Sequence, residues 1–131
     1  RFQETASKLL SLYFKNKDNL SGSIESKVLQ SWLRAEAYAL NIYQTASNLM
    51  AGKKIGPESS LGKVFWSELD HQMHQTALDI LGVSSELEEV VADDVASWIK
   101  GYMFSYSGPS YAGTNEIQKN IIAERLLGMP R

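Results

Sequence analysis

The order of apolar and polar residues along the chain predicts helices. In residues 2–13, apolar side chains recur at spacings of three and four, which places them on one helical face. A second stretch keeps this spacing for longer, and its leucines and a tyrosine beside the main positions widen the apolar face enough to meet two neighbours. The positions that repeat are Val28, Trp32, Ala35, Ala39, Ile42, Ala46 and Leu49.

Turn-forming residues predict where these helices begin and end. The polar stretch KNKDNLSGS breaks the first helix, and Ser23 is the expected N-cap of the second. Gly52 is expected just beyond the end of the second helix. Pro57 is expected at the first position of a third helix, which Gly82 ends.

The remaining segments complete the predicted fold. Residues 84–98 are acidic and are expected to form a solvated excursion with a short helical turn, and residues 105–113 to form a loop. A last helix carries Ile117, Ile121, Ile122 and Leu126 on its apolar face. Four main helices joined by short or moderate links predict an all-α fold, an antiparallel four-helix bundle. We expect residues 1–131 to be one domain and a C-terminal fragment of a longer protein, because the chain begins without Met inside an apparent helix.

Composition narrows the classes of function. Hydrophobic residues make up 44% and charged residues 21%, as in ordinary globular proteins. The net charge is -2 with no long basic run, so nucleic-acid binding is not expected. The absence of cysteine excludes disulfides, zinc thiolates and thiol nucleophiles. No run of 18 apolar residues predicts a membrane span.

Several features that could suggest a ligand have simpler interpretations. Glu68 and His71 have the spacing used by di-iron bundles, but such a site needs a second motif, and the only other histidine is His74. The acidic run between Glu86 and Asp94 lacks the ligand pattern of an EF-hand loop. We therefore expect no metal site. The aromatic residues have helical spacing, which favours core packing over a cofactor box.

The C-terminal string YAGTNEIQKNIIAERLLGMPR carries the most specific signal. Gly113 permits close approach of the backbone to a ligand, and the Thr114 hydroxyl can cap the helix. The amides of Thr114, Asn115 and Glu116 are among the unpaired donors of a helix start, which can hold a phosphate. On physical grounds alone a well-capped final helix is the simpler interpretation.

This string resembles the C-terminal signature of the acyl-CoA dehydrogenases, which read Tyr-Glu/Gly-Gly-Thr-x-x-Ile-Gln and close with Leu-Gly-x-Pro-Arg. The stretch PESSLGKVFWSELDHQMHQTALDILG is similar to the Ser-x-x-Lys helix that precedes the family's glycine-rich turn. The resemblance implies an FAD-dependent enzyme that α,β-desaturates an acyl-CoA thioester and passes electrons to an electron-transfer flavoprotein. It also implies a homo- or hetero-oligomer in the cytoplasm, or in the mitochondrial matrix of a eukaryote.

The resemblance assigns roles to individual residues. Gly113, Thr114 and Glu116 match positions that approach FAD in the family, and Tyr111 matches a residue that lines the acyl pocket. Many members place the catalytic glutamate after that tyrosine, where this chain has Ala112. Because alanine cannot accept a proton, no catalytic residue is expected in this chain, and the isolated fragment is expected to be inactive. Some members supply the base from an earlier helix.

Other departures leave alternatives open. Where the family often has a glutamine that reaches the flavin of a neighbouring subunit, this chain has Asp79, whose charge is unfavourable near a pyrophosphate. Gly82 is followed by Val83 instead of a second glycine, and an Arg-x-x-Phe-Gly flavin motif is absent. One alternative is therefore a partner subunit without a base in a heteromeric dehydrogenase. The other is a helical interaction domain with no redox role.

Overall fold

The computed structural model describes residues 1–82 and 93–130, and every regular element in these ranges is helical. The predicted all-α class is therefore confirmed. The elements are α1 (Phe2–Asn16), the short 3₁₀ helix η1 (Lys17–Asn19), α2 (Gly22–Met50), α3 (Ser59–Leu81), α4 (Asp93–Ser105), α5 (Asn115–Ile121) and the π-helical turn η3 (Ile122–Leu126).

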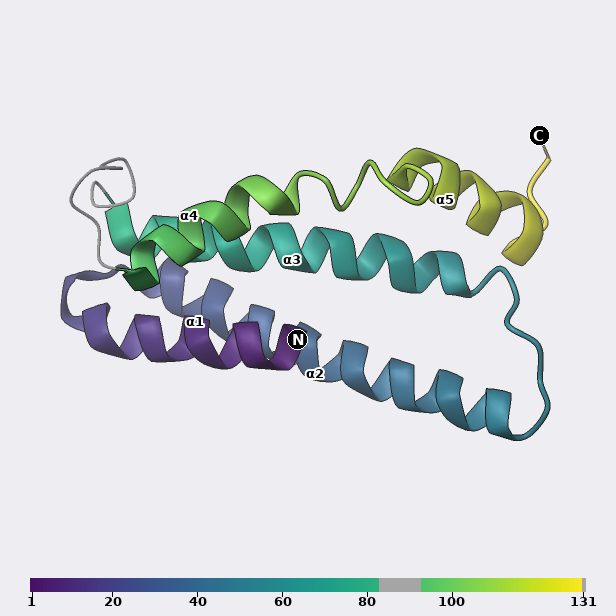
Figure 1. Cartoon of the computed structure of the whole chain (residues 1–131), viewed down its shortest axis with the longest axis horizontal. Helices are drawn as coiled ribbons and strands as arrows, with labels where there is room; N and C mark the ends of the chain where they lie inside the picture. Colours follow the sequence, from purple (N-terminus) through teal and green to yellow (C-terminus); the bar gives the residue numbers. More distant parts are fainter. Residues whose placement is uncertain (83–92, 131) are drawn as a thin grey trace.

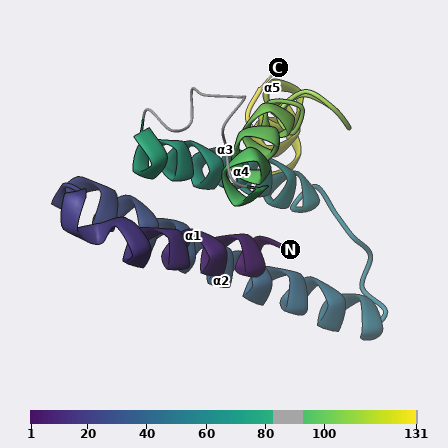
Figure 2. The same cartoon turned by 60° about the vertical axis from the view of Figure 1, so that its left-hand side comes forward.

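The helices form an antiparallel bundle around α3. Figure 1 shows α1, α2 and α3 alternating in direction, with α4 and α5 following one another along α3. In the turned view of Figure 2, α1 and α2 lie on one side of α3 while α4 and α5 lie on the other. Helix α3 contacts all four of the other α-helices. The fourth position of the bundle is thus shared by two shorter helices.

The core lies where these helices meet. Leu9 of α1, Val28 of α2 and Leu69 of α3 are among the side chains fully removed from solvent. Trp98 of α4 closes the same cluster. The other buried apolar members are Ala6, Leu12, Ala35, Met73, Ala77 and Ile80.

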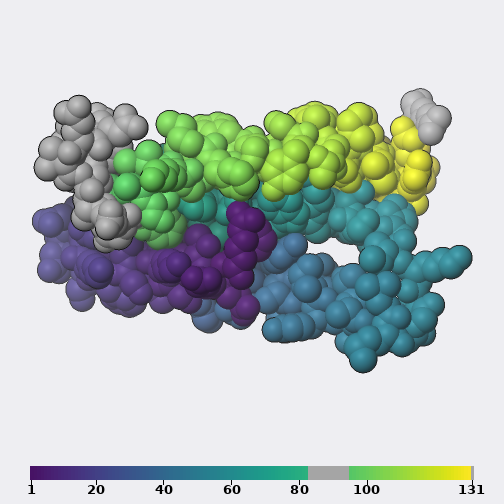
Figure 3. All heavy atoms as spheres, viewed as in Figure 1, coloured from purple at the N-terminus to yellow at the C-terminus, as the bar shows by residue number. Residues whose placement is uncertain are grey.

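The long apolar face predicted for the second helix is buried only in its first half. Helix α2 has 29 residues and α1 has 15, so the second half of α2 extends past its neighbour. Ile42 and Leu49 remain 45% and 46% exposed, although Ala35 is buried. Figure 3 shows an opening between this part of α2 and the start of α3. The periodicity identified an apolar face but could not show how far a neighbouring helix would cover it.

Both predicted helix starts were wrong by two residues. Helix α2 begins at Gly22 after Ser21, so Ser23 lies inside it, and the Ser21 and Ser23 hydroxyls pair at 2.7 Å. Helix α3 begins at Ser59, and Pro57 belongs to the preceding turn. The carboxylate of Glu58 accepts a hydrogen bond from the Gly56 amide at 3.2 Å, which favours that turn over an earlier helix start.

The helix ends were predicted better than the starts. Gly52, at φ 77°, directly follows the C-cap of α2, and Gly82, at φ 55°, caps α3. Much of the predicted acidic excursion lies outside the described residues. Where the description resumes, α4 is a 13-residue helix, much longer than the short turn expected from the sequence.

The aromatic residues were only partly predicted. Trp98 is buried as expected, whereas Phe14 and Tyr43 are exposed despite their helical spacing. Their positions show that helical periodicity places an aromatic ring on a face without deciding what covers that face. No helix in the described part of the chain has the length and hydropathy needed to cross a bilayer.

Candidate functional site

Tyr111, Ala112, Gly113 and Thr114 lie on a turn, residues 106–115, that joins α4 to α5 and packs on α3, and Glu116 follows in the first turn of α5. Gly108 brings the turn against α3, where an added Cβ would lie 3.3 Å from the Trp66 ring and 3.3 Å from the Ser67 Cβ. Glycine therefore permits a close approach that a larger residue would hinder. The ring of Tyr111 also packs on Trp66, at 5.9 Å between centroids.

The half-buried Lys63 of α3 supports the turn by hydrogen bonds on its buried side. The Lys63 ammonium donates to the Asn115 side-chain oxygen at 2.7 Å and to the Pro109 carbonyl at 3.2 Å. The Ser67 hydroxyl lies 3.1 Å from the same Asn115 oxygen and 3.0 Å from the Val64 carbonyl, so its single proton can serve one acceptor at a time.

The turn presents the sequence-predicted residues together at the surface. Ala112, Gly113, Thr114 and Glu116 are exposed, and Tyr111 is 43% exposed. Asn115, placed among them, is only 5% exposed. The buried Asn115 side chain thus anchors the exposed main chain on either side of it.

The backbone of the turn has an uncommon shape. Ala112 has φ 55° and Gly113 has φ 82°, so two successive residues are left-handed. For a residue with a side chain this conformation is unfavourable and persists where surrounding contacts determine it. The Gln118 side chain supplies one such contact by donating to the Ala112 carbonyl at 3.2 Å. At φ 82° a side chain at position 113 would be strained, and an added Cβ would also lie 2.7 Å from the same Gln118 nitrogen, so glycine is favoured there.

The predicted cap of the last helix is confirmed. The Thr114 hydroxyl accepts a hydrogen bond from the Ile117 amide at 3.3 Å. The expectation of a free amide at this helix start is wrong for Asn115. The Asn115 amide donates to the Pro109 carbonyl at 2.9 Å. The pKa of Glu116 is lowered, first by a hydrogen bond from its own backbone N–H and then by one from the Thr114 hydroxyl, with weaker attractions from Lys119 and Lys63. The anion held at this helix start is the chain's own Glu116 carboxylate.

Asp79 lies near the other end of α3 from the turn. It is 16 residues from Lys63, a distance of roughly 24 Å along a helix. Its carboxylate pairs with Lys27 of α2 at 2.8 Å and accepts from Gln75 at 3.1 Å. Its negative charge is therefore balanced within the chain, and its carboxylate joins α2 to α3.

The Glu68 and His71 pair is used for contacts within the chain. His71 Nδ1 lies 2.9 Å from the Ser105 hydroxyl, which donates to the Tyr102 carbonyl at 2.6 Å, so His71 is the donor. Glu68 pairs with Lys119 at 3.4 Å. Within residues 1–82 and 93–130, no three histidine or acidic side chains gather as metal ligands do. That the chain holds no metal stays a prediction.

A buried carboxylate lies in the core, away from the turn. Asp70 is 3% exposed, and one of its oxygens accepts from Arg1 at 3.0 Å. Among the described residues the other oxygen has no hydrogen-bond partner; it lies 3.5 Å from His74 Nδ1, which donates to the Asp70 backbone carbonyl at 2.8 Å. Because the side chain is closed off from solvent, we assign Asp70 to packing between α1 and α3.

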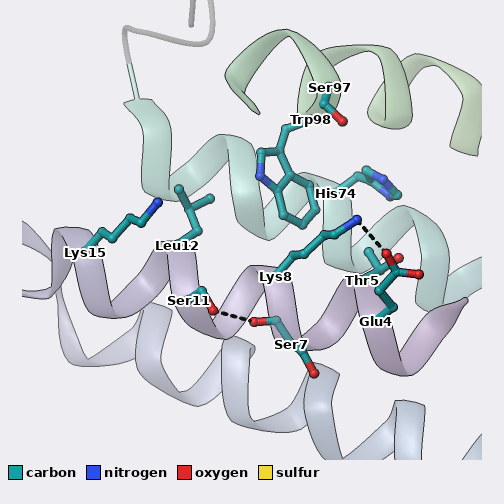
Figure 4. A pocket seen from close by; sticks show the side chains of 10 residues that line it. All are labelled: Glu4, Thr5, Ser7, Lys8, Ser11, Leu12, Lys15, His74, Ser97 and Trp98. Atoms are coloured by element: carbon teal, nitrogen blue, oxygen red, sulfur yellow. Dashed lines mark hydrogen bonds and ion pairs between the residues drawn. The ribbon is translucent and has the colours of Figure 1, made fainter. Parts of the chain in front are cut away.

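A groove of about 580 Å³ between α1 and α4 is separate from the turn. Figure 4 shows Lys8 directed to Glu4 and the Ser11 hydroxyl to the main chain at Ser7, with Trp98 over the groove. His74 also lines it, but its Nδ1 proton is already donated to the backbone. These polar groups are occupied by contacts within the chain, so the groove is a weaker candidate site than the turn.

The residues that support the turn were not identified from the sequence. Lys63, Ser67, Asn115 and Gln118 provide its side-chain hydrogen bonds to α3 and α5. A signal for the first of them was present, because Ser60 and Lys63 form the Ser-x-x-Lys pattern of the third helix. A periodic pattern cannot reveal that this lysine meets residues 46 and 52 positions further along the chain.

Comparisons with known proteins agree with this arrangement. Residues 21–127 match the family model of the acyl-CoA dehydrogenase C-terminal domain. The chain is 32% identical over 109 residues to acyl-CoA dehydrogenase IpdE1 of Mycolicibacterium smegmatis, covering 82% of this chain and 26% of that protein. It is 30% identical over 111 residues to IpdE1 of Mycobacterium tuberculosis, with 82% and 27% covered. Acyl-CoA dehydrogenase FadE26 of the same species is 27% identical over 110 residues, with 75% and 26% covered.

The chain therefore belongs to the acyl-CoA dehydrogenase family and corresponds to its C-terminal domain. It spans about a quarter of the length of the curated relatives that it matches. No solved structure matches it significantly.

Proposed function

We propose that this chain is the C-terminal helical part of an FAD-dependent acyl-CoA dehydrogenase, which α,β-desaturates an acyl-CoA thioester. The observation that supports this most is the anchored turn, because it exposes Tyr111, Ala112, Gly113 and Thr114 together on a rigid base. Family membership supplies the reaction class. Since the matched region is only 26% of the first of these relatives, the rest of the site would come from other parts of the protein.

The turn fits one part of FAD better than another. The exposed main chain at Gly113 carries no Cβ, so a planar ring or ribose could approach it closely. The pyrophosphate fits poorly at the start of α5, because the Glu116 carboxylate already holds that position. We infer that Gly113 and Thr114 contact an uncharged polar part of the cofactor, and that Glu116 accepts hydrogen bonds there.

The residues of this chain would bind and orient, and would not move the proton. When bound, FAD accepts the hydride that leaves the substrate Cβ as a base takes the proton from Cα. The Tyr111 ring, supported by Trp66, would form one wall of the acyl pocket. Ala112 has no group that could take the proton, so the carboxylate base would lie elsewhere in the protein.

Ala112 also supports a second candidate function. In a heteromeric dehydrogenase, a subunit without a base would keep the helical domain and the turn while its partner performs the proton transfer. Ala112 at the position of the usual glutamate is the observation that favours it. The two candidates make opposite predictions for the Ala112→Glu variant, which are described in the Discussion.

Replacing Gly113 with alanine in the full-length protein should weaken FAD binding about tenfold. The substitution forces a left-handed alanine, a strain of roughly 1–3 kcal/mol, and displaces the Gln118 amide that holds the Ala112 carbonyl, so the turn loses support. Gly128→Ala is the matched control, because Gly128 also has a positive φ of 67° but has open space around it. Flavin fluorescence titration of the apoprotein gives both dissociation constants, and thermal unfolding measures the strain.

The comparison between the two variants decides the proposal. Both should lose a little thermal stability, and only Gly113→Ala should lose FAD affinity. Equal FAD affinity in both variants would place the cofactor away from this turn. A wild-type protein that carries no flavin and has no acyl-CoA-dependent activity would favour the helical interaction domain.

We also propose that the protein is a homo- or hetero-oligomer and that α2 contributes to its interface. Exposed apolar side chains extend along this helix, and such surfaces usually mark contacts with another chain. These residues are Leu29, Trp32, Leu33, Leu40, Ile42, Tyr43, Leu49 and Met50, which we term the α2 surface. From the family alone we propose an electron-transfer flavoprotein as the electron acceptor and the cytoplasm, or the mitochondrial matrix of a eukaryote, as the location.

A charge on the α2 surface should weaken self-association. Leu40 is 67% exposed, so Leu40→Glu should preserve folding while placing a carboxylate in the contact. We expect the dissociation constant from sedimentation velocity to rise at least about tenfold. Gln30→Glu is the control, because it adds the same charge at an exposed polar position of α2. A wild type that stays monomeric at high concentration would contradict the proposal for a homo-oligomer.

A further inference from the structure

One ammonium group joins the two ends of the candidate turn. Lys63 Nζ donates to the carbonyl of Pro109 at 3.2 Å and to the side chain of Asn115 at 2.7 Å. The same Pro109 carbonyl accepts the Asn115 amide at 2.9 Å. Lys63, Pro109 and Asn115 thus form a closed set of three contacts around the base of the turn.

The turn needs such a support because its shape is unfavourable by itself. Ala112 and Gly113 are both left-handed, and a left-handed alanine persists only where its surroundings determine it. The Gln118 contact holds the exposed side of the turn, and the Lys63 contacts hold its buried side. Hydrogen bonds from a charged donor are stronger than those between neutral groups.

The contacts of Lys63 favour a local role over general stabilisation of the fold. Its hydrogen-bond partners are Pro109 and Asn115, and both belong to the turn. Its charge also acts on Glu116, at the start of α5, whose pKa it helps to lower. Loss of the ammonium should therefore loosen residues 106–118 and leave α1 and α2 as they are.

We propose that Lys63 is a positioning residue that sets the conformation of the turn and, through it, the main chain at Ala112, Gly113 and Thr114. This inference rests on the proposed function only in its last step, from the turn to FAD. The hold of Lys63 on the turn can be measured without the cofactor. Ser67, whose hydroxyl lies beside the same Asn115 oxygen, assists it.

The test uses the full-length protein with Lys63→Met, which keeps a long side chain and removes the donors. Amide hydrogen exchange in residues 106–118 of the apoprotein should become about tenfold faster, since a charge-assisted contact is lost. The FAD dissociation constant should rise by about the same factor. Lys63→Arg retains charge and donors and should restore most of both. Lys100→Met, at an exposed lysine of α4, should change neither.

Each outcome bears on one step of the inference. Unchanged exchange in residues 106–118, or faster exchange spread equally over α1 and α2, would overturn the role of Lys63. Faster local exchange with unchanged FAD affinity would overturn the step from turn to cofactor. If the wild type binds no FAD, the proposed function fails, while local exchange still decides whether Lys63 holds the turn. If Lys63→Met does not fold, Ser67→Ala should give a smaller increase in the same segment, and no increase would overturn the inference.

Discussion

Replacing Ala112 with glutamate in the full-length protein should lower acyl-CoA-dependent turnover about tenfold, if another segment supplies the base. The new carboxylate would face the same substrate carbon as that base, and two carboxylates in one site raise a pKa by mutual repulsion. Each unit by which the base pKa moves from its optimum reduces the working fraction by about tenfold. Ala112 is exposed and already left-handed, so glutamate adds little new backbone strain.

The control and the opposite outcome are both informative. Ala112→Gln has nearly the same size without the charge, so a loss specific to glutamate would identify repulsion as the cause. An inactive wild type whose turnover rises in Ala112→Glu by roughly 10²- to 10⁴-fold would instead support the partner subunit without a base. Reduction of an electron-acceptor dye by the wild type and both variants, with acyl-CoA as substrate, measures this directly.

Leu69→Ala should lower the free energy of unfolding of the chain by about 2–5 kcal/mol. Leu69 is 0% exposed at the centre of α3, and its removal leaves a cavity that the surrounding helices cannot fill. A loss of this size is a large part of the 5–15 kcal/mol by which a typical domain is stable. Urea denaturation followed by circular dichroism gives the value.

Leu61→Ala is the matched control, because it makes the same substitution in the same helix. Leu61 is 47% exposed, so the loss should stay below about 1 kcal/mol. Losses of similar size in the two variants would contradict the assignment of the core to the middle of α3.

Local signals in the sequence were sufficient for α1, α2, α3 and α5 and for the C-terminal ends of α2 and α3. Gly52 and Gly82 stop α2 and α3 because a left-handed residue at a helix end is easiest for glycine. Helix α4 was underestimated because its acidic first turn hides the spacing of Val95, Trp98 and Tyr102, which continues through the helix. The acidic composition of this segment thus obscured the helical periodicity of its apolar residues.

The candidate site was predicted in position but not in its internal contacts. The terminal motif identified Tyr111, Gly113, Thr114 and Glu116, which the structure places together at the surface. The sequence could not show that the Glu116 carboxylate turns back to the helix start, because that depends on a side-chain rotamer. It also could not reveal the Lys63 contacts, which form only after α5 packs against α3.

The division of the fourth position of the bundle between α4 and α5 has a consequence for what the surface can offer a ligand. Inside a continuous helix each carbonyl and N–H is used by the residue four positions away, so only side chains are available for recognition. The turn between α4 and α5 interrupts this pairing and leaves several peptide groups outside any helix. Helix α3 packs against the turn and supports it there. Most substitutions of exposed side chains there, apart from the strained position Gly113, would leave the peptide groups in place, whereas insertion of one residue between Pro109 and Asn115 would displace all of them together. Loop length is therefore expected to affect the peptide groups of this joint more than the identity of most exposed side chains does.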